Sequence, residues 1–184
     1  MSDPFKLIAI VGMPGAGKTI AADFFRHKGV PVLRFGDQTD IGLRELGKPL
    51  TEANERWYRE KLRSDLGMAA MAIKIEPRIL KESEHSILIV LDGLYSWEEY
   101  LYLKEKFPQL LLLSVYAPPG LRHSRLSKRP VRPLAKQEAV SRDKAEIENL
   151  NKAGPIAIAD YLVRNNTTVN ALHANLEKLY KVFV

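Results

Sequence analysis

The sequence predicts an α/β fold in which a doubly wound sheet of five parallel strands carries helices on both faces. Two observations lead to this fold class. Short apolar runs alternate with longer segments of helical pattern, and no internal repeat interrupts them. A glycine-rich loop joins the first apolar run to the first helical segment. A chain of 184 residues suits one core, so residues 1–184 are expected to form a single domain.

The first predicted strand covers residues 7–11 and leads into Gly12-Met13-Pro14-Gly15-Ala16-Gly17-Lys18-Thr19. This stretch fits G-x-x-x-x-G-K-[ST], the phosphate-binding P-loop or Walker A motif, and residues 20–27 supply the helix that the motif requires. The glycines let successive backbone N–H groups point into one concavity at a helix N-terminus. Lys18 is expected to reach the β- and γ-phosphates of a nucleotide, and the Thr19 hydroxyl to ligate Mg²⁺. A chance match is disfavoured, because strand and helix both stand where the motif needs them.

The second predicted strand, residues 30–35, ends at Gly36-Asp37. In an open α/β sheet, ligands bind outside the carboxyl ends of the strands, so Asp37 is placed to meet a substrate. An Asx-turn or a helix cap explains Asp37 equally well.

The segment after this strand is expected to be irregular over residues 40–51, where glycine and proline recur. A helix with Thr51 as its N-cap then runs to about residue 74, with an interruption at Gly67. Its arginines, taken singly, are most simply parts of a solvated face that pairs with neighbouring acids.

The third predicted strand, residues 86–91, has hardly a polar break and is therefore expected near the centre of the sheet. It ends in Asp92, which is the Walker B arrangement downstream of a P-loop. The carboxylate is expected beside Thr19, where it holds Mg²⁺ directly or through water. A lone aspartate at a strand end is common, so this interpretation rests on its combination with the P-loop.

The remaining predicted elements follow in order. They are helices over residues 97–106, 120–128, 136–151 and 169–181, and strands over residues 110–115 and 160–165. Pro130 and Pro133 predict an exposed, partly extended loop after the second of these helices. Gly154-Pro155 is expected to end the third of these helices.

Two regions depart from the simple alternation, about residues 38–75 and about residues 128–145. They stand where a phosphotransferase carries the cover that binds its acceptor and a small basic lid. Such an enzyme works mainly by positioning and by neutralising charge on the moving phosphoryl group, and it must keep water out.

The formal net charge is +6 and the pI about 9.5, and much of the excess lies in a segment without acids. Its basic residues are Arg122, Arg125, Lys128, Arg129, Arg132 and Lys136. A lid of this composition would place guanidinium groups over phosphates. A solvated basic loop and a weak nucleic-acid patch are the alternatives. A nucleic-acid-dependent ATPase is disfavoured, because single-strand binders interleave aromatic and basic residues and this segment has no aromatic.

Composition excludes several other classes. The chain has no cysteine, so it has neither disulfides nor thiolate metal sites. No apolar stretch approaches membrane-spanning length, and no secretory signal is visible at the N-terminus, so a cytoplasmic location is expected. A GTPase is disfavoured, because Asn151-Lys152-Ala153-Gly154 lacks the final aspartate of the guanine-reading pattern.

Further motifs follow the P-loop in a fixed order. They are Phe35-Gly36-Asp37, Leu62-Arg63 followed by Gly67, Asp92-Gly93 with Ser96, Arg122 with Arg125-Leu126, Arg142-Asp143 with Glu146, Ala159-Asp160-Tyr161, and Asn165. With these motifs, which cover almost the whole chain, it resembles the P-loop kinases of the nucleoside monophosphate kinase and dephospho-coenzyme A kinase group. Within that group it is most similar to prokaryotic proteins labelled dephospho-coenzyme A kinase-like or AAA-family ATPase.

The resemblance implies ATP on the P-loop together with Mg²⁺. It implies catalytic roles for Lys18, for Arg142 as a lid residue that contacts phosphates, and for Asp37, near which the acceptor is expected to bind. It also implies that Arg122 or Arg125 lies near the base or the phosphates of the donor.

Two positions depart from the pattern of these relatives. Asp40 and Tyr95 stand where the relatives usually have arginines that face the phosphate of the acceptor. Arg44, Arg59 and Arg63 are candidates to replace them. Otherwise the acceptor is unusual, or transfer has been lost and nucleotide binding remains.

The sequence thus predicts a kinase that transfers the γ-phosphoryl group of ATP to dephospho-coenzyme A or a nucleoside monophosphate. The alternative is a nucleotide-binding regulatory protein with little turnover. Asp40 and Tyr95 favour this alternative, and it is opposed by the retained Lys18, Thr19, Asp92 and Arg142. A small-molecule acceptor is the expected partner. The identity of the acceptor and the oligomeric state remain open.

Overall fold

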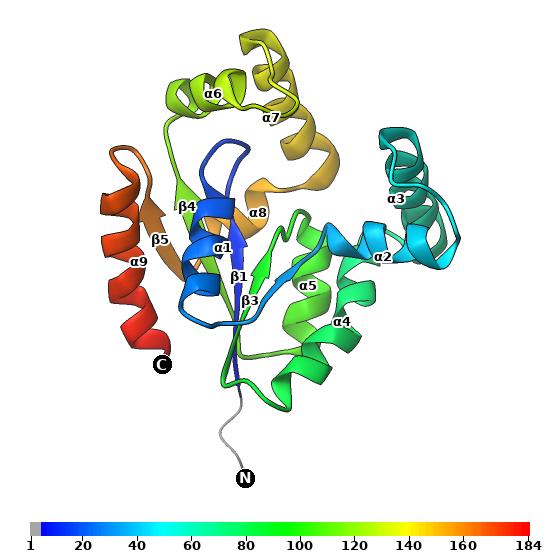
Figure 1. Ribbon diagram of the computed structural model, residues 1–184, viewed down its shortest axis with the longest axis horizontal. Helices are drawn as coiled ribbons and strands as arrows, with labels where there is room; N and C mark the ends of the chain where they lie inside the picture. The colour runs from blue at the N-terminus through cyan, green and yellow to red at the C-terminus, as the bar shows by residue number, and fades with distance from the viewer. Residues whose placement is uncertain (1–4) are drawn as a thin grey trace.

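The strands form one parallel sheet that orders the rest of the chain. The computed structural model describes residues 5–184, and in this range the sheet has five strands in the order β2-β3-β1-β4-β5 (Figure 1). The strands are β1 (Lys6–Val11), β2 (Val32–Arg34), β3 (Leu88–Asp92), β4 (Leu110–Tyr116) and β5 (Tyr161–Arg164). All pairings between neighbours are parallel, which confirms the predicted fold class. The expectation of no secretory signal rests on residues 1–4 and lies outside the described range.

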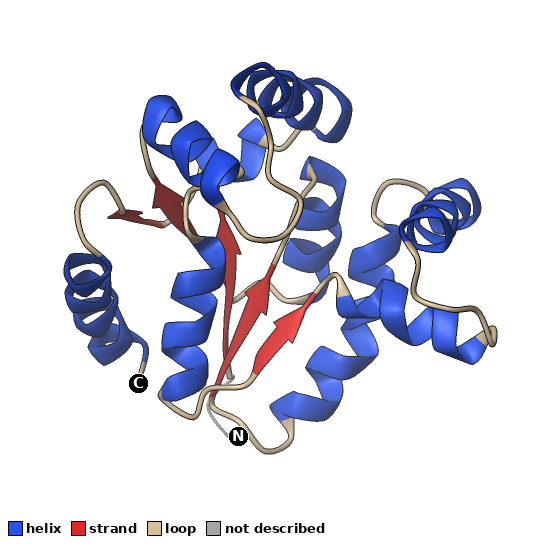
Figure 2. Cartoon of the chain, turned by 45° about the horizontal axis from the view of Figure 1, so that its top comes forward, coloured by secondary structure: helices blue, strands red, loops and turns tan. Residues whose placement is uncertain are grey.

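Helices cover both faces of the sheet (Figure 2). On one face lie α1 (Lys18–His27) and α9 (Val169–Phe183), and on the other lie α4 (Ala70–Ser83) and α5 (Trp97–Lys106). Each face of the sheet has its own apolar core, and strand β1 contributes to both. Leu7 and Ala9 pack on the face of α4 and α5, and Ile8 and Ile10 pack on the face of α1 and α9. This two-sided burial explains why the strand is an unbroken apolar run. Within residues 5–184, no helix has both the length and the apolar composition that a membrane crossing needs.

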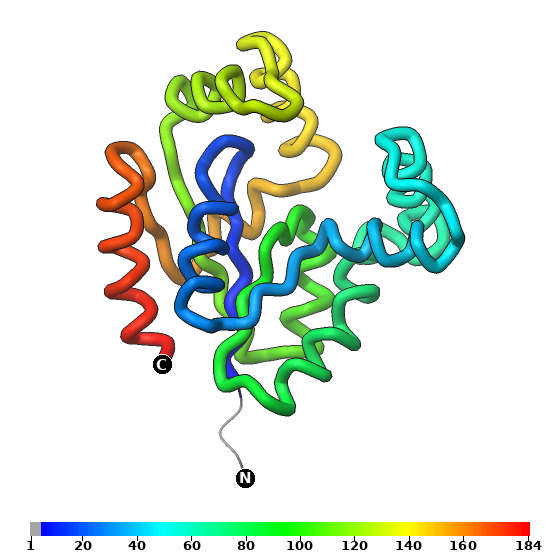
Figure 3. The backbone as a smooth tube through the Cα atoms, viewed as in Figure 1, coloured from blue at the N-terminus to red at the C-terminus, as the bar shows by residue number. Residues whose placement is uncertain are grey.

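Two helical regions project beyond the carboxyl ends of the strands. One consists of α2 (Asp37–Glu45) and α3 (Glu52–Leu66), and the other of α6 (Pro119–Lys128), α7 (Lys136–Leu150) and the short α8 (Ala153–Ala157). Figure 3 shows the α6–α7 region above the loop that follows β1, and α3 to its side. Both regions therefore stand at the edge of the sheet where ligands of such folds bind.

Local capping signals start several of these helices. The predicted N-cap Thr51 is confirmed, because its hydroxyl accepts the Asn54 N–H at 3.3 Å. Ser96 and Glu99 form a capping box at the start of α5, in which each side chain accepts a backbone N–H of the other residue. The box fixes the direction in which the chain leaves β3.

The irregular segment expected over residues 40–51 is wrong in its first half. Helix α2 runs through it to Glu45, although it contains Gly42. The reason is a tertiary contact, because a Cβ at Gly42 would overlap the ring and hydroxyl of Tyr58 on α3. Glycine is present here so that two helices can approach closely, and the approach stabilises a helix that propensity alone disfavours.

Two further boundaries differ from expectation. The helix expected to end near residue 74 is two helices, separated at Gly67, and the second continues through Pro77 to Ser83. The break expected at Gly154-Pro155 lies earlier, at Asn151, whose φ of 50° ends α7 in the left-handed region. Gly154 and Pro155 instead belong to α8.

The contact between Gly42 and Tyr58 leads to a prediction about stability. We expect Gly42→Ala to lower the free energy of unfolding by roughly 1–3 kcal/mol, because the added methyl group overpacks the α2–α3 contact. Urea unfolding followed by circular dichroism measures the change.

Gly120→Ala is the matched control. A Cβ at Gly120, also in a helix, meets no atom within 4 Å, so this variant is expected to be neutral or slightly more stable. Equal stabilities of the two variants would contradict the packing explanation.

Candidate functional site

The P-loop joins β1 to α1 in the conformation that its motif requires. Gly15 and Gly17 have φ values of 77° and 103°, in the region that glycine reaches without strain. Gly17 is the N-cap of α1, and the Ala16 N–H donates to the Met13 carbonyl at 3.1 Å, which closes the turn of the loop. The loop therefore presents its backbone at the start of a helix, where the dipole favours an anion.

Two side chains from distant segments hold the loop in place. Arg122 of α6, buried, donates to the Pro14 carbonyl at 2.9 Å. Asn165, just after β5, donates to the Ala16 carbonyl at 2.8 Å. Arg125 in turn donates to the Asn165 carbonyl at 2.8 Å. The loop is thus preorganised by α6 and by the end of β5.

A cavity of about 490 Å³, here called the donor cavity, opens over the loop. It is lined by Pro14, Gly15, Gly17, Lys18, Thr19, Ile20, Arg34, Asp92, Tyr95, Arg125, Leu126, Arg129 and Arg142. Most of the predicted donor-binding residues therefore meet in one space. Arg122 does not join them. With Gly12, Met13 and Ala16 it lines a smaller cavity of about 160 Å³, because its guanidinium is used to bind the loop and Asp143.

Thr19 and Asp92 both line the donor cavity, as a Walker A and Walker B pair would. A hydroxyl and a carboxylate are hard oxygen donors that suit Mg²⁺, which keeps several waters and takes few protein ligands. In residues 5–184 no group of three or more His, Asp or Glu side chains is gathered as a metal site. The donor set fits a Mg²⁺ ion that completes its shell with phosphate oxygens and water.

The charges at the loop are held in a crowded, partly buried cluster. Lys18 donates to the carbonyls of Gly12 at 2.8 Å and Met13 at 3.3 Å. Burial, and next the positive charge of Lys152, lower the pKa of Lys18 to about 7. Burial also raises the pKa of Asp92, against the opposing effect of Lys18. Phosphate groups would favour the charged form of Lys18, so the cluster is suited to a polyanion.

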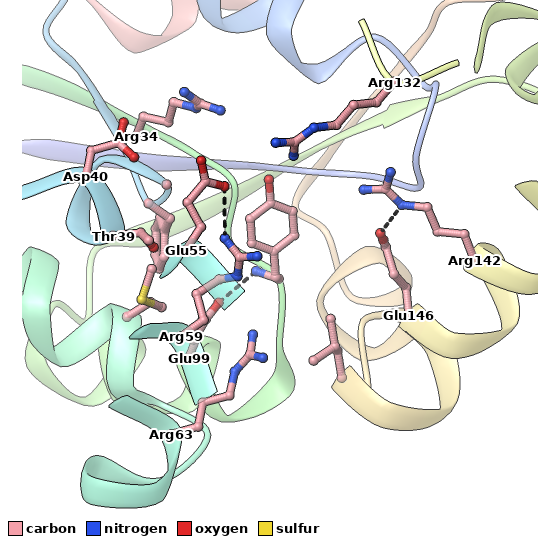
Figure 4. A pocket seen from close by; sticks show the side chains of 15 residues that line it. Arg34, Thr39, Asp40, Glu55, Arg59, Arg63, Glu99, Arg132, Arg142 and Glu146 are labelled. Atoms are coloured by element: carbon pink, nitrogen blue, oxygen red, sulfur yellow. Dashed lines mark hydrogen bonds and ion pairs between the residues drawn. The ribbon is translucent and has the colours of Figure 1, made fainter. Parts of the chain in front are cut away.

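A second cavity of about 490 Å³, here called the acceptor cavity, lies beside the first (Figure 4). It is lined by Arg34, Phe35, Gly36, Thr39, Asp40, Glu55, Arg59, Arg63, Met71, Tyr95, Glu99, Arg132, Arg142, Glu146 and Leu150. Arg34, Tyr95 and Arg142 line both cavities. These three residues, here called the junction, mark where the two spaces meet.

Some of the cations in the acceptor cavity are paired and others are not. Arg59 lies 3.5 Å from Glu55, and Arg142 donates to Glu146 at 3.0 Å. Among the described residues, Arg34 and Arg63 have no acidic partner within 4.0 Å. Figure 4 shows Arg34 and Arg132 reaching toward each other from opposite sides of the cavity. An anion bound here would have guanidinium groups to pair with.

The predicted catalytic residues are separated by the structure. Lys18 and Arg142 share the donor cavity, whereas Asp37 lines neither large cavity. Asp37 begins α2 and lies 3.5 Å from Arg78 of α4. Asp40, in the next turn of α2, lines the acceptor cavity instead. The catalytic role of Asp37 stays a prediction, and its observed contact is an ion pair between two helices.

Sequence reasoning missed three residues of the site. Arg34 ends β2, and a lone charge at the carboxyl end of a strand is the signal that could have found it. Glu99 is 2% exposed, yet it lines the acceptor cavity and accepts the N–H groups of Tyr95 and Ser96. Lys152 is buried, and no local signal in the sequence marks its burial.

The buried carboxyl of Glu99 leads to a prediction about pH. Burial raises the pKa of Glu99 from 4.5 to about 7, so the folded protein holds this proton more tightly than the unfolded chain. Stability from Glu99 is therefore full below pH 4.5 and is lost as the pH rises to about 7. We expect the difference in unfolding free energy between wild type and Glu99→Gln to change by on the order of 3 kcal/mol over this window.

Glutamine keeps the oxygen that accepts the two N–H groups, so the capping box survives in this variant. Glu105→Gln, an exposed change on the same helix, controls for the loss of a carboxylate. Urea unfolding at a series of pH values from 4.5 to above 7 makes the comparison. The prediction would be contradicted if the unfolding free energies of wild type and Glu99→Gln differed by the same amount at every pH.

Comparisons with known proteins place this geometry in a family. A family model described as an AAA domain matches residues 8–150. The UPF0200 protein of Pyrococcus horikoshii is 30% identical over 177 residues, which are 94% of this chain and 95% of the relative. The UPF0200 protein of Sulfurisphaera tokodaii is 33% identical over 180 residues, or 96% of each.

Solved structures agree on the fold. The TT1252 protein of Thermus thermophilus superposes with a TM-score of 0.69 at 19% identity, over 98% of each chain. A shikimate kinase from Bacteroides thetaiotaomicron gives a TM-score of 0.60 at 15% identity, over 96% of this chain and 98% of that one. At such identities the likeness concerns the fold alone, which is that of a P-loop kinase. The chain belongs to the AAA-domain family that the model describes and to the UPF0200 family.

Proposed function

We propose that this protein transfers the γ-phosphoryl group of ATP to a nucleotide or nucleotide-like small molecule, such as dephospho-coenzyme A or a nucleoside monophosphate. The observation that carries the proposal is the pair of cavities of about 490 Å³ that share Arg34, Tyr95 and Arg142. One contains the P-loop and suits a donor, and the other adjoins it and suits an acceptor. A protein that only binds a nucleotide has no need of the second.

On the donor side, the N–H groups of the loop and the start of α1 hold the phosphates of ATP. Lys18 pairs with the β- and γ-phosphates, and Thr19 and Asp92 hold the metal. Mg²⁺, when bound, neutralises part of the charge on those phosphates. Arg125 and Leu126 line the same cavity and are candidates to contact the rest of the donor.

Transfer takes place at the junction. The phosphoryl group that passes between donor and acceptor spreads its charge over its oxygens, so fixed cations beside its path stabilise the transition state. Arg34 and Arg142 reach this place from β2 and from α7. Tyr95 stays protonated, because burial and next the charge of Asp92 raise its pKa to about 12, so its hydroxyl is available to donate a hydrogen bond to the phosphoryl group.

On the acceptor side, Arg59 and Arg63 of α3 hold the anionic group of the acceptor. They line the cavity, whereas Arg44, the third candidate from the sequence, does not. Phe35 and Met71 offer apolar contact on the same wall. Asp40 also lines this cavity and adds a negative charge to it.

Asp40 also supports a second candidate function. A carboxylate in the acceptor cavity repels an acceptor phosphate, as it would in a regulatory protein that binds a nucleotide with little turnover. This candidate needs no acceptor. The two candidates are separated by whether formation of ADP depends on a second small molecule.

The test is Mg²⁺-dependent ADP production from ATP against a panel of acceptors: nucleoside monophosphates, their deoxy forms and dephospho-coenzyme A. We expect one of them to stimulate ADP production, and Lys18→Ala to abolish this stimulation while the protein stays folded, because the phosphates lose their cation. Unchanged turnover in Lys18→Ala would contradict the P-loop mechanism. ATP binding without stimulation by any acceptor would favour the regulatory candidate.

A second prediction concerns the lid. We expect Arg142→Ala to lower turnover by on the order of a hundredfold or more, as for other groups that stabilise developing charge. Steady-state kinetics with the stimulating acceptor measures the effect. Lys144→Ala, an exposed change on the same helix, is the control and is expected to retain wild-type turnover. A loss of roughly tenfold or less in Arg142→Ala would mean that another arginine supplies the stabilisation.

A further inference from the structure

A buried lysine, Lys152, contacts one of the three junction residues directly and a second one through a carboxylate. Lys152 is 2% exposed and follows the left-handed turn at Asn151 that ends α7. Its Nζ contacts the Glu146 carboxylate and lies 4.5 Å from the centroid of the Tyr95 ring. A buried ammonium persists only with such partners, so these contacts fix Lys152 between α7 and the loop after β3.

The Glu146 carboxylate links Lys152 to Arg142, because it accepts a hydrogen bond from each. Its Oε2 accepts from Lys152, and its Oε1 accepts from Nε of Arg142 at 3.0 Å (Figure 4). Among the described residues, the terminal nitrogens of Arg142 form no hydrogen bond, so they stay available to the two cavities that this residue lines. The Arg142 side chain is 44% exposed and long, and a fixed carboxylate restricts the orientations that it samples.

Lys152 itself lines neither large cavity. We propose that Lys152 is a positioning residue for phosphoryl transfer, which holds Tyr95 directly and Arg142 through Glu146. The proposal rests on the proposed function, because what is positioned is a group that stabilises the transferred phosphoryl. In this proposal Glu146 and Lys152 orient the residues that contact the phosphoryl group.

The kinetic test is Lys152→Met, which keeps the length of the side chain and removes its charge. We expect kcat to fall by about tenfold or more, since a loosened Arg142 acts mainly on the transition state, while the KM for ATP changes by less than about threefold. Lys144→Met is the matched control, because Lys144 is an exposed lysine that pairs with Glu148 on α7, the helix that carries Arg142. Its kinetics are expected to equal those of the wild type. A fall confined to KM would overturn the proposal.

A double-mutant cycle asks whether Lys152 acts through Arg142. In the Arg142→Ala background, Lys152→Met is expected to lower kcat further by less than about threefold, because the group that it positions is already absent. If Lys152 acted independently of Arg142, the loss of kcat in the double variant would equal the product of the two single losses. That result would overturn the proposal.

A third measurement does not depend on turnover. The Nε–H resonance of Arg142, identified by its loss in Arg142→Ala, is expected to shift and to exchange faster with water in Lys152→Met, and to stay in place in Lys144→Met. An unmoved resonance overturns the positioning role whatever the kinetics. If the wild type turns over no acceptor, the proposed function fails and this resonance alone decides whether Lys152 positions Arg142. If Lys152→Met does not fold, Lys152→Gln, which also removes the charge and leaves the acceptor Glu146 in place, is expected to give the same shift.

Discussion

The contact of Arg122 with the P-loop determines how the two halves of the site meet. The buried guanidinium donates to the Pro14 carbonyl and forms a two-pronged pair with Asp143 of α7 at 2.9 and 2.7 Å. One planar cation thereby joins the loop to the lid helix in a fixed orientation. Because Asp143 is next to Arg142 in α7, the same contact sets where Arg142 stands over the cavities. Removing either partner would leave a buried charge uncompensated, so loop and lid depend on each other.

The site concentrates positive charge that the folded protein alone does not fully balance. Burial, and next the positive charge of Lys152, lower the pKa of Lys18 to about 7, and Arg34 lines the same cavity as Lys18. Burial and the neighbouring like charge both disfavour the charged form of Lys18 in the free protein, and Glu146 and Asp92 oppose this effect. An anionic ligand relieves the repulsion. Binding of a polyanion and stability of the fold are therefore linked through these few residues.

Local patterns were enough to predict the sheet, the P-loop between β1 and α1, and Asp92 at the end of β3. The glycines of the P-loop and the strand that ends in Asp92 each carry their signal within a few residues. Helix α2 could not be found this way, because it forms where Gly42 lets Tyr58 of α3 approach closely. Lys152 could not be found for the same reason, because only the turn at the end of α7 brings it against Glu146 and Tyr95. Arg34 differs, because a charge at the carboxyl end of a strand is a local signal.

Asp40 and Tyr95 stand at two positions where the resembling kinases usually have arginines. The charge of the acceptor cavity also depends on cations that other segments supply. Asp40 and Tyr95 replace cations, yet Arg34 and Arg63 line the same cavity, and Lys152 lies directly behind the Tyr95 ring. The potential that an acceptor meets depends on distances to charges, not on which segment supplies them. Loss of the two arginines therefore does not by itself argue against a phosphate in this cavity. In this chain the cations of the acceptor cavity come from β2 and α3, among them Arg34 and Arg63, so the proposed acceptor is expected to place its anionic group there.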